Sequence, residues 1–166
     1  MPEKETLERA HEDEREGKAP STQAGEFVKE EMDHIREGKH GARSTKQAIA
    51  IGLSKARRAG VKLPAPKAGK TSEATRKKAE HDLQKGSRPA SKKSAKRSRA
   101  VEGALQREGH SAASHASLSK QARQAARQRG SAARKQAAKK AVRTKGPAEL
   151  RQAARKAART RQGRAA

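Results

Sequence analysis

Apolar side chains recur at helical spacing only within the first 63 residues of the chain. Two segments, 21–37 and 44–59, each place theirs on one face. Such spacing predicts two amphipathic helices. Joined by the short stretch 38–43, they form an expected αα-hairpin. We assign its helical core to Phe27, Val28, Met32, Ile35, Ile49 and Leu53.

Glycines and hydroxyl residues punctuate these helices. Residues 3–16, 21–37 and 44–59 each end just before a glycine, and Ser21 or Thr22 and Ser44 are expected N-caps. Ser44 with Gln47 forms an expected capping box. Gly52, inside the predicted helix, indicates a close approach of the partner helix. Val61 and Leu63 are placed to fold back on the hairpin.

Beyond residue 66 the helical pattern continues almost without large apolar side chains. Segments 71–85, 89–108, 117–129, 131–145 and 147–162 each end at or near a glycine or follow one, and Pro147 suits the first turn of the last helix. Residues 67–166 hold six large aliphatic side chains. We therefore expect an all-α protein. It would comprise a helical hairpin or three-helix module (1–63), a linker (64–70), and a basic tail (71–166) that is largely disordered or helical without packing.

The composition supports this division. Leu, Ile, Val and Phe number 15 of 166 residues, whereas alanine numbers 34. A large-apolar share below roughly 20%, combined with high net charge, is typical of disordered chains. The chain has no cysteine, which excludes disulfides and thiolate metal sites. A single domain that buries all 166 residues is therefore not expected.

Charge separates the two ends of the sequence. Residues 1–40 carry a net charge of −5, and residues 41–166 carry +29. Such asymmetry is typical of a nucleic-acid-binding tail. Guanidinium groups pair bidentately with phosphate, and the tail repeats them at helical spacing. The expected phosphate-binding residues are Lys92, Lys93, Lys96, Arg97, Arg99, Arg123, Arg127, Arg129, Arg134, Lys135, Lys139, Lys140, Arg143, Arg151, Arg155, Lys156 and Arg159.

The tail lacks aromatic residues, so it offers no platform for stacking bases. The sequence thus predicts DNA binding through phosphates without base preference, in the manner of a nucleoid-associated protein. An RNA- or ribosome-associated protein is the first alternative. A stress-related or virion-packaged protein, whose acidic N-terminus shields its own tail, is the second. A helix-turn-helix built on the hairpin is less favoured than a packing or self-association unit, because its loop is long.

Nothing in the sequence indicates an enzyme, a cofactor or a membrane partner. The Gly-Lys-Thr at 69–71 lacks the rest of a P-loop, and no catalytic signature occurs. The six histidines are scattered, and His34 and His40, which flank a loop, are interpreted as surface residues rather than metal ligands. No apolar run is long enough to cross a membrane. We expect a cytoplasmic location, at the nucleoid.

Residues 30–60, "EEMDHIREGKHGARSTKQAIAIGLSKARRAG", resemble a small bacterial and phage family of unknown function. Its signature reads approximately M-H-E-F-K-x-G followed by KQAIAIALSEA. Matching positions are Met32, Gly38, the run 46–51, Leu53, Ser54 and Ala56, whereas Ile35, Gly52 and Lys55 depart from it. Several members carry Lys/Ala-rich tails similar to those of bacterial histone-H1-like proteins. The resemblance spans about a fifth of the chain and implies no established activity.

Overall fold

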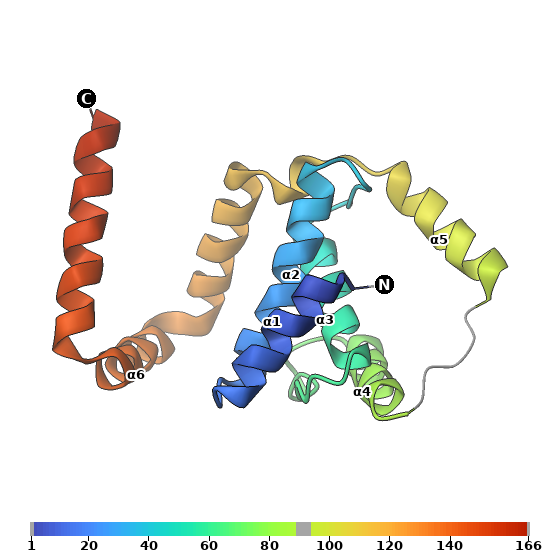
Figure 1. Cartoon of the computed structure of the whole chain (residues 1–166), viewed down its shortest axis with the longest axis horizontal. Helices are drawn as coiled ribbons and strands as arrows, with labels where there is room; N and C mark the ends of the chain where they lie inside the picture. Colours follow the sequence, from blue (N-terminus) through green and yellow to red (C-terminus); the bar gives the residue numbers. More distant parts are fainter. Residues whose placement is uncertain (1, 89–93, 166) are drawn as a thin grey trace. The chain divides into compact units, whose positions relative to one another are not determined.

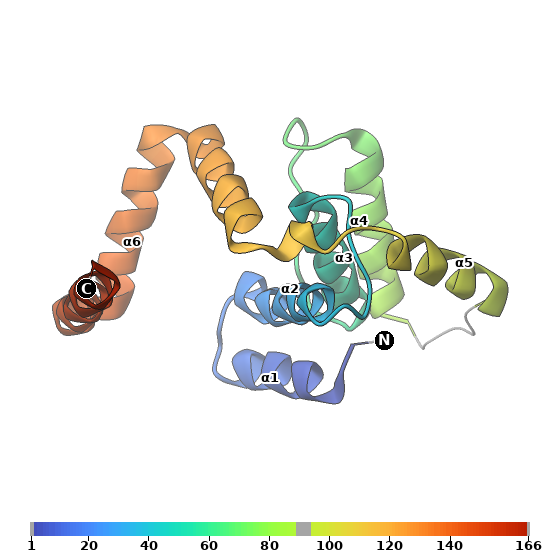
Figure 2. The same cartoon turned by 90° about the horizontal axis from the view of Figure 1, so that it is seen from above.

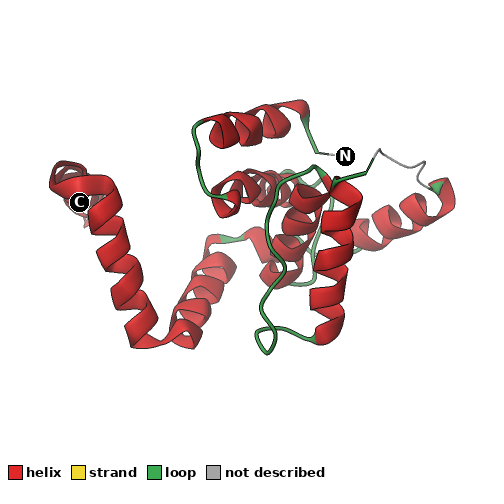
Figure 3. Ribbon diagram, turned by 90° about the horizontal axis from the view of Figure 1, so that it is seen from below, coloured by secondary structure: helices red, strands yellow, loops and turns green. Residues whose placement is uncertain are grey.

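The structure, a computed structural model, describes residues 2–88 and 94–165. Every regular element in these ranges is helical (Figures 1 and 3), which confirms the all-α prediction. The elements are α1 (Lys4–Arg15), α2 (Pro20–Arg36), α3 (Thr45–Arg58), α4 (Glu73–Gly86), α5 (Ala95–Gln106), the 3₁₀ turn η1 (Ser111–Ala113) and α6 (His115–Ala165). The chain divides into two compact units, Met1–Gln121 and Ala122–Ala166.

Helices α2 and α3 form the expected hairpin at the centre of the first unit. From α2, Phe27, Met32 and Ile35 are buried, as predicted. Val28, Ile49 and Leu53 are only partly buried and border the core. Apart from Arg57, the buried residues of α3 have small side chains, and at Gly52 α2 approaches too closely for a larger one. These small residues are Thr45, Ala48, Gly52 and Ala56.

Gly52 is the point of closest approach. A Cβ at this position would lie 2.7 Å from the Cα of Val28 and 3.0 Å from the carbonyl oxygen of Phe27. Both are backbone atoms, which cannot move aside as a side chain can. The predicted role of Gly52 is confirmed.

The start of α3 agrees with the predicted cap, with one difference. The Ser44 hydroxyl accepts from the backbone N–H of Gln47. The Gln47 side chain, however, accepts from the N–H of Arg43 at 3.0 Å rather than from that of Ser44. The capping box is thus closed one residue earlier than its usual form.

The start of α2 corrects the sequence interpretation. The helix begins at Pro20 with Ala19 in the capping position, not at Ser21 or Thr22, and Ala19 makes no side-chain cap. Proline is favoured in the first turn because it has no N–H to leave unpaired there and its φ is already helical. The proline outweighed the hydroxyl side chains that follow it.

Helix α1 packs against α2 (Figure 2) mainly through small and polar side chains. Thr6, Ala10 and Asp13 are buried, and Arg9 pairs with Glu26 of α2 at 2.7 Å. After α3, Val61 and Leu63 pack in the apolar cluster that also contains Ala10, as the sequence indicated.

Helix α4 lies within the segment expected to be an unpacked tail, yet it packs on α3. Ala79 and Asp82 are buried. Asp82 accepts from the Ser54 hydroxyl at 2.6 Å and from Arg58 Nε at 2.7 Å. An acidic side chain with two donors on α3 therefore docks a helix that has few apolar residues to bury.

The residues after α5 also belong to the packed unit. The N–H of Gly41 donates to the carbonyl of Leu105, and that of Ala42 to Gly109. The Thr45 hydroxyl donates to the carbonyl of Ala112 at 2.6 Å. Ala112 and its neighbour Ala113 are buried against the hairpin core, with Leu118 beside them. Packing thus extends to Gln121, whereas the sequence indicated a module ending at residue 63.

Gly130 and Gly146 divide α6 into three helical segments. Both glycines have positive φ, +73° and +70°, and extended ψ. The predicted breaks at these positions are confirmed. The structure shows helix in this part of the tail, so the disordered alternative is not confirmed.

Candidate nucleic-acid interface

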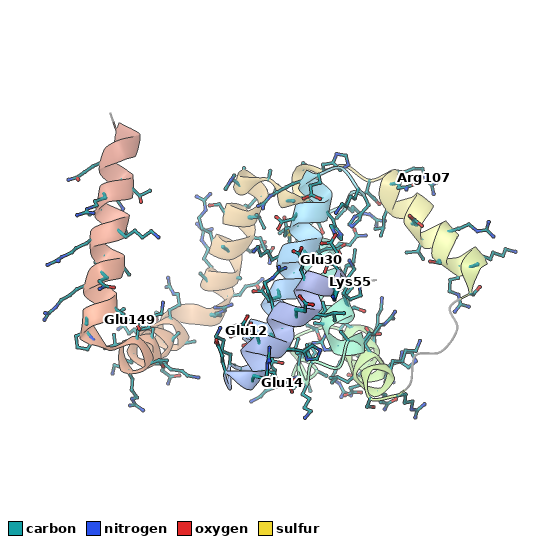
Figure 4. The ribbon with its side chains drawn as sticks, viewed as in Figure 1. Glu12, Glu14, Glu30, Lys55, Arg107 and Glu149 are labelled. Carbon is teal, nitrogen blue, oxygen red and sulfur yellow. The ribbon has the colours of Figure 1, made fainter. Side chains whose placement is uncertain are left out.

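The second unit presents cations to solvent on nearly every turn. Between residues 122 and 163 there are 14 lysines and arginines and one acid, Glu149, and all of these charged side chains are exposed. Figure 4 shows the nitrogen-tipped side chains projecting from α6 on several sides. This surface forms because alanine supplies helix propensity without requiring burial.

The last segment of α6, after Gly146, carries three arginines in a stripe along one face. Arg151, Arg155 and Arg159 follow one another at four-residue spacing, so they lie on one face about 6 Å apart along the axis. The middle segment of α6, between Gly130 and Gly146, spreads its cations more widely around the helix. Its exposed members among the predicted residues are Arg134, Lys135, Lys139, Lys140 and Arg143.

These cations have no acidic partners. Among described residues 127–161, no lysine or arginine forms an ion pair with a carboxylate. Their charges are therefore available to an external anion.

The remaining predicted residues are distributed between the units. Arg123, Arg127, Arg129 and Lys156 lie exposed in the second unit. Lys96, Arg97 and Arg99 are exposed on α5, which belongs to the first unit. Lys92 and Lys93 fall outside the described residues. The described members of the predicted set thus belong to both units.

In the first unit, by contrast, many charges are paired internally. Lys18 lies 2.7 Å from Asp13, and this hydrogen bond raises the pKa of Lys18. The hydrogen bond from Arg9 to Glu26 likewise raises the pKa of Arg9. Burial lowers the pKa of Arg57, which donates to the carbonyl of Leu63. The first unit therefore uses much of its charge to hold its own helices together.

A buried polar cluster at the end of the hairpin was not predicted. Lys55 of α3 lies 3.2 Å from Glu30 and 2.7 Å from Glu31 of α2 (Figure 4 labels Glu30 and Lys55). The only sequence signal was the placement of a carboxylate and an imidazole three residues apart, at Glu31 and His34. Buried acids are rare enough that the pattern reads as surface.

The interpretation of two histidines as surface residues is wrong. The side chains of His34 and His40 are only 12% and 15% exposed. His34 Nε2 lies 2.8 Å from Glu3. The hydrogen bonds that Glu3 accepts from His34 and, second, from Lys39 hold its pKa below the usual value. The end of α2 and the following loop enclose both rings. The polar residues around them in the sequence do not indicate this burial.

The comparisons with known proteins concern the hairpin. Residues 20–68 match a family of unknown function (DUF6496). The matched region runs from the first residue of α2 past α3, and it contains residues 30–60. The resemblance to an uncharacterised family is thereby confirmed at that level. Searches of curated proteins and of solved structures returned no significant match. None of the described helices is long and apolar enough to cross a membrane.

Proposed function

We propose that this protein binds nucleic acid without sequence preference, through phosphate contacts of residues 122–166, and that duplex DNA is its principal ligand. One observation carries the proposal: residues 122–163 of the second unit expose 14 cations and one acid on helices that bury almost nothing of their own. A helix without a core is stabilised best by a partner of opposite charge.

The chemistry of the side chains favours phosphate. Arg151, Arg155 and Arg159 offer planar guanidinium groups, which bind phosphate oxygens in pairs. Binding would remove the mutual repulsion of these charges and release counterions from the duplex. No aromatic residue occurs in residues 122–166, so contacts to bases would add little.

This mode corresponds to a nucleoid-associated, histone-H1-like protein in the cytoplasm that acts without catalysis. The first unit would then serve as a folded anchor for the basic helices. Self-association through the hairpin remains a prediction. The hairpin keeps Val28, Ile49 and Leu53 only partly buried, so a dimer would use these residues at the border of the core.

Fluorescence anisotropy of the full chain on a 20-base-pair DNA duplex, over a salt series, tests the proposal. With about 8 phosphates neutralised, the slope of log K against log salt should be about −7. The triple variant R151Q/R155Q/R159Q should bind more weakly. Its slope should be less negative by about 2 to 3. Glutamine keeps the helix propensity close to that of arginine.

The matched control removes three exposed, unpaired lysines from the first unit: K46Q/K62Q/K77Q. Both triple variants lower the net charge equally. The proposal requires a clearly larger loss from the arginine variant. Equal losses would show that overall charge alone drives binding, and salt-independent binding would rule out phosphate contacts.

Two further comparisons address the alternatives. The same chain on duplex RNA distinguishes an RNA-associated protein, which would bind RNA markedly more tightly than DNA. A peptide of residues 122–166 tests self-shielding by the acidic end. The ion pairs of Asp13, Glu26 and Asp82 within the first unit favour equal binding by peptide and chain. Much tighter binding by the peptide would support the shielded alternative.

A further inference from the structure

Three potential metal ligands converge where α2 ends and its loop turns back. Glu31 and His34 lie on one face of α2, three residues apart, and His40 lies in the loop before α3. Each offers one ligand atom, and the three atoms all lie within 4.8 Å of one another. The two imidazole rings are edge to face, with centroids 6.0 Å apart.

The Glu31 carboxylate is buried without adequate partners. Its side chain is 0% exposed, and neither oxygen accepts a hydrogen bond of acceptable geometry. Lys55 Nζ lies 2.7 Å from Oε2 and His40 Nε2 lies 3.3 Å from Oε1, close enough for attraction but poorly aligned for hydrogen bonding. A buried carboxylate in this state is costly unless a cation completes its surroundings.

Both imidazoles are already held as metal ligands usually are. His40 Nδ1 lies 3.1 Å from the carbonyl of Gly41, which can only accept, so Nδ1 donates to it and Nε2 is the nitrogen that faces Glu31. His34 Nε2 is paired with Glu3, which leaves Nδ1 as the second ring nitrogen for an ion. One ring nitrogen fixed by a carbonyl or carboxylate is typical of histidines that bind metal.

The loop that carries His40 is fixed from outside. The N–H groups of Gly41 and Ala42 donate to the carbonyls of Leu105 and Gly109 at 2.9 and 3.0 Å. A Cβ on Gly41 would collide with the backbone of Glu108. The loop and the segment after α5 are therefore in direct backbone contact. The ligand loop is therefore positioned before any ion binds.

The local charge admits a divalent cation. Around the two rings lie three carboxylates, Glu3, Glu30 and Glu31, and two ammonium groups, Lys39 and Lys55. Their sum is one negative charge. Lys55 lies at Oε2 of Glu31, which leaves Oε1, the oxygen nearest His40, for an ion.

We propose that Glu31, His34 and His40 bind one zinc ion, with a water molecule as the fourth ligand. Two imidazole nitrogens and one carboxylate oxygen suit zinc, whereas calcium and magnesium take oxygen ligands. Zinc bonds of about 2.0–2.2 Å in a tetrahedron place ligand atoms about 3.3 Å apart. Side-chain rotations that close the present spacing, at most 4.8 Å, by up to about 1.5 Å would complete the site. The ion would join α2 to the loop before α3, independently of nucleic-acid binding.

The test uses the full chain without a polyhistidine tag, stripped of metal by a chelator. Titration calorimetry with zinc chloride should show one equivalent bound, and the melting temperature followed by circular dichroism should rise. Zinc binding should shift the imidazole NMR signals of His34 and His40 but not those of the exposed His81 and His110.

Two single variants, H34Q and H40Q, should each weaken zinc binding by more than about tenfold. The double variant H81Q/H110Q, which removes two exposed rings, should bind as the parent does. Metal-free melting curves of H34Q and H40Q show whether each variant folds. If one does not, the NMR shifts of the parent decide alone. Absence of binding, signals that shift at other histidines, or unchanged affinity in folded H34Q and H40Q would overturn the proposal.

Discussion

The Cα of Val28 lies 2.7 Å from the point that a Cβ on Gly52 would occupy. The α2–α3 hairpin thus brings backbone against backbone at this crossing. We expect Gly52→Ala to lower the free energy of unfolding by about 1–3 kcal/mol, because the overpacking outweighs the gain in helix propensity. Thermal and urea unfolding followed by far-ultraviolet circular dichroism measures it.

Gly25 is the matched control for this prediction. It also lies inside a helix, α2, but a Cβ there would meet no atom within 4 Å. Gly25→Ala should therefore stabilise the protein by up to about 1 kcal/mol. If both substitutions stabilised, the close approach at Gly52 would be refuted.

Asp82 is predicted to hold α4 on α3. Asp82→Ala removes the hydrogen bonds from Ser54 and Arg58 and should cost about 2–3 kcal/mol. Hydrogen exchange of the α4 amides should accelerate more than that of α2. Glu80→Ala is the control, because Glu80 pairs only with Arg76 of the same helix and should change stability by less than about 0.5 kcal/mol. Unchanged exchange in α4 would contradict a docked helix.

Acid pH should weaken the first turn of α4. A hydrogen bond from Arg76 holds the pKa of Glu73 below its usual value. The ionised form is thus favoured in the folded state. Its contribution is present above the unfolded-state pKa and is lost as the pH falls through the lower, folded-state pKa. A side-chain carboxyl NMR titration should show this pKa rising in R76Q and unchanged in K77Q. An unchanged value in R76Q would exclude the pair in solution.

The two glycines of α6 should respond differently to alanine. No atom opposes a Cβ at Gly130, and Ser131 follows it, so Gly130→Ala should merge two helical segments and raise the helicity. Gly146 precedes Pro147, and a residue before proline is kept out of the α region. Gly146→Ala should leave the break in place. Carbon-13 secondary shifts at residues 129–131 and 145–147 check both results, and a merged helix at 146 would refute the second.

The ends of helices at glycines were the most predictable part of this protein, whereas the start of α2 was not predicted. Glycine stops and the Ser44 cap are local signals, so the sequence indicates them directly. The hairpin core was half predictable: Phe27 and Ile35 are buried as apolar size suggests, but the small face of α3 at Ala48 and Ala56 is decided by how closely the helices approach. Hydropathy ranks such residues too low to reveal that.

Long-range docking by polar groups was not predictable. Asp82 and Thr45 are buried because each meets partners from distant parts of the chain, and neither residue type indicates burial by itself. The same holds for Glu31, whose surroundings of His40 and Lys55 arise only when the loop folds back. The predicted phosphate-binding residues of the second unit, in contrast, follow from charge and spacing, and their role remains a prediction.

Under the proposed function, the glycine joints at 130 and 146 affect how much nucleic acid one molecule covers. Each helical segment of about 15 residues extends about 22 Å. Because the joints separate the helical segments, each segment would attach through its own phosphate contacts, and the occupied length should increase in steps. On a duplex that other molecules partly occupy, one segment could stay bound while the others release. The protein would then move along the duplex gradually instead of dissociating all at once.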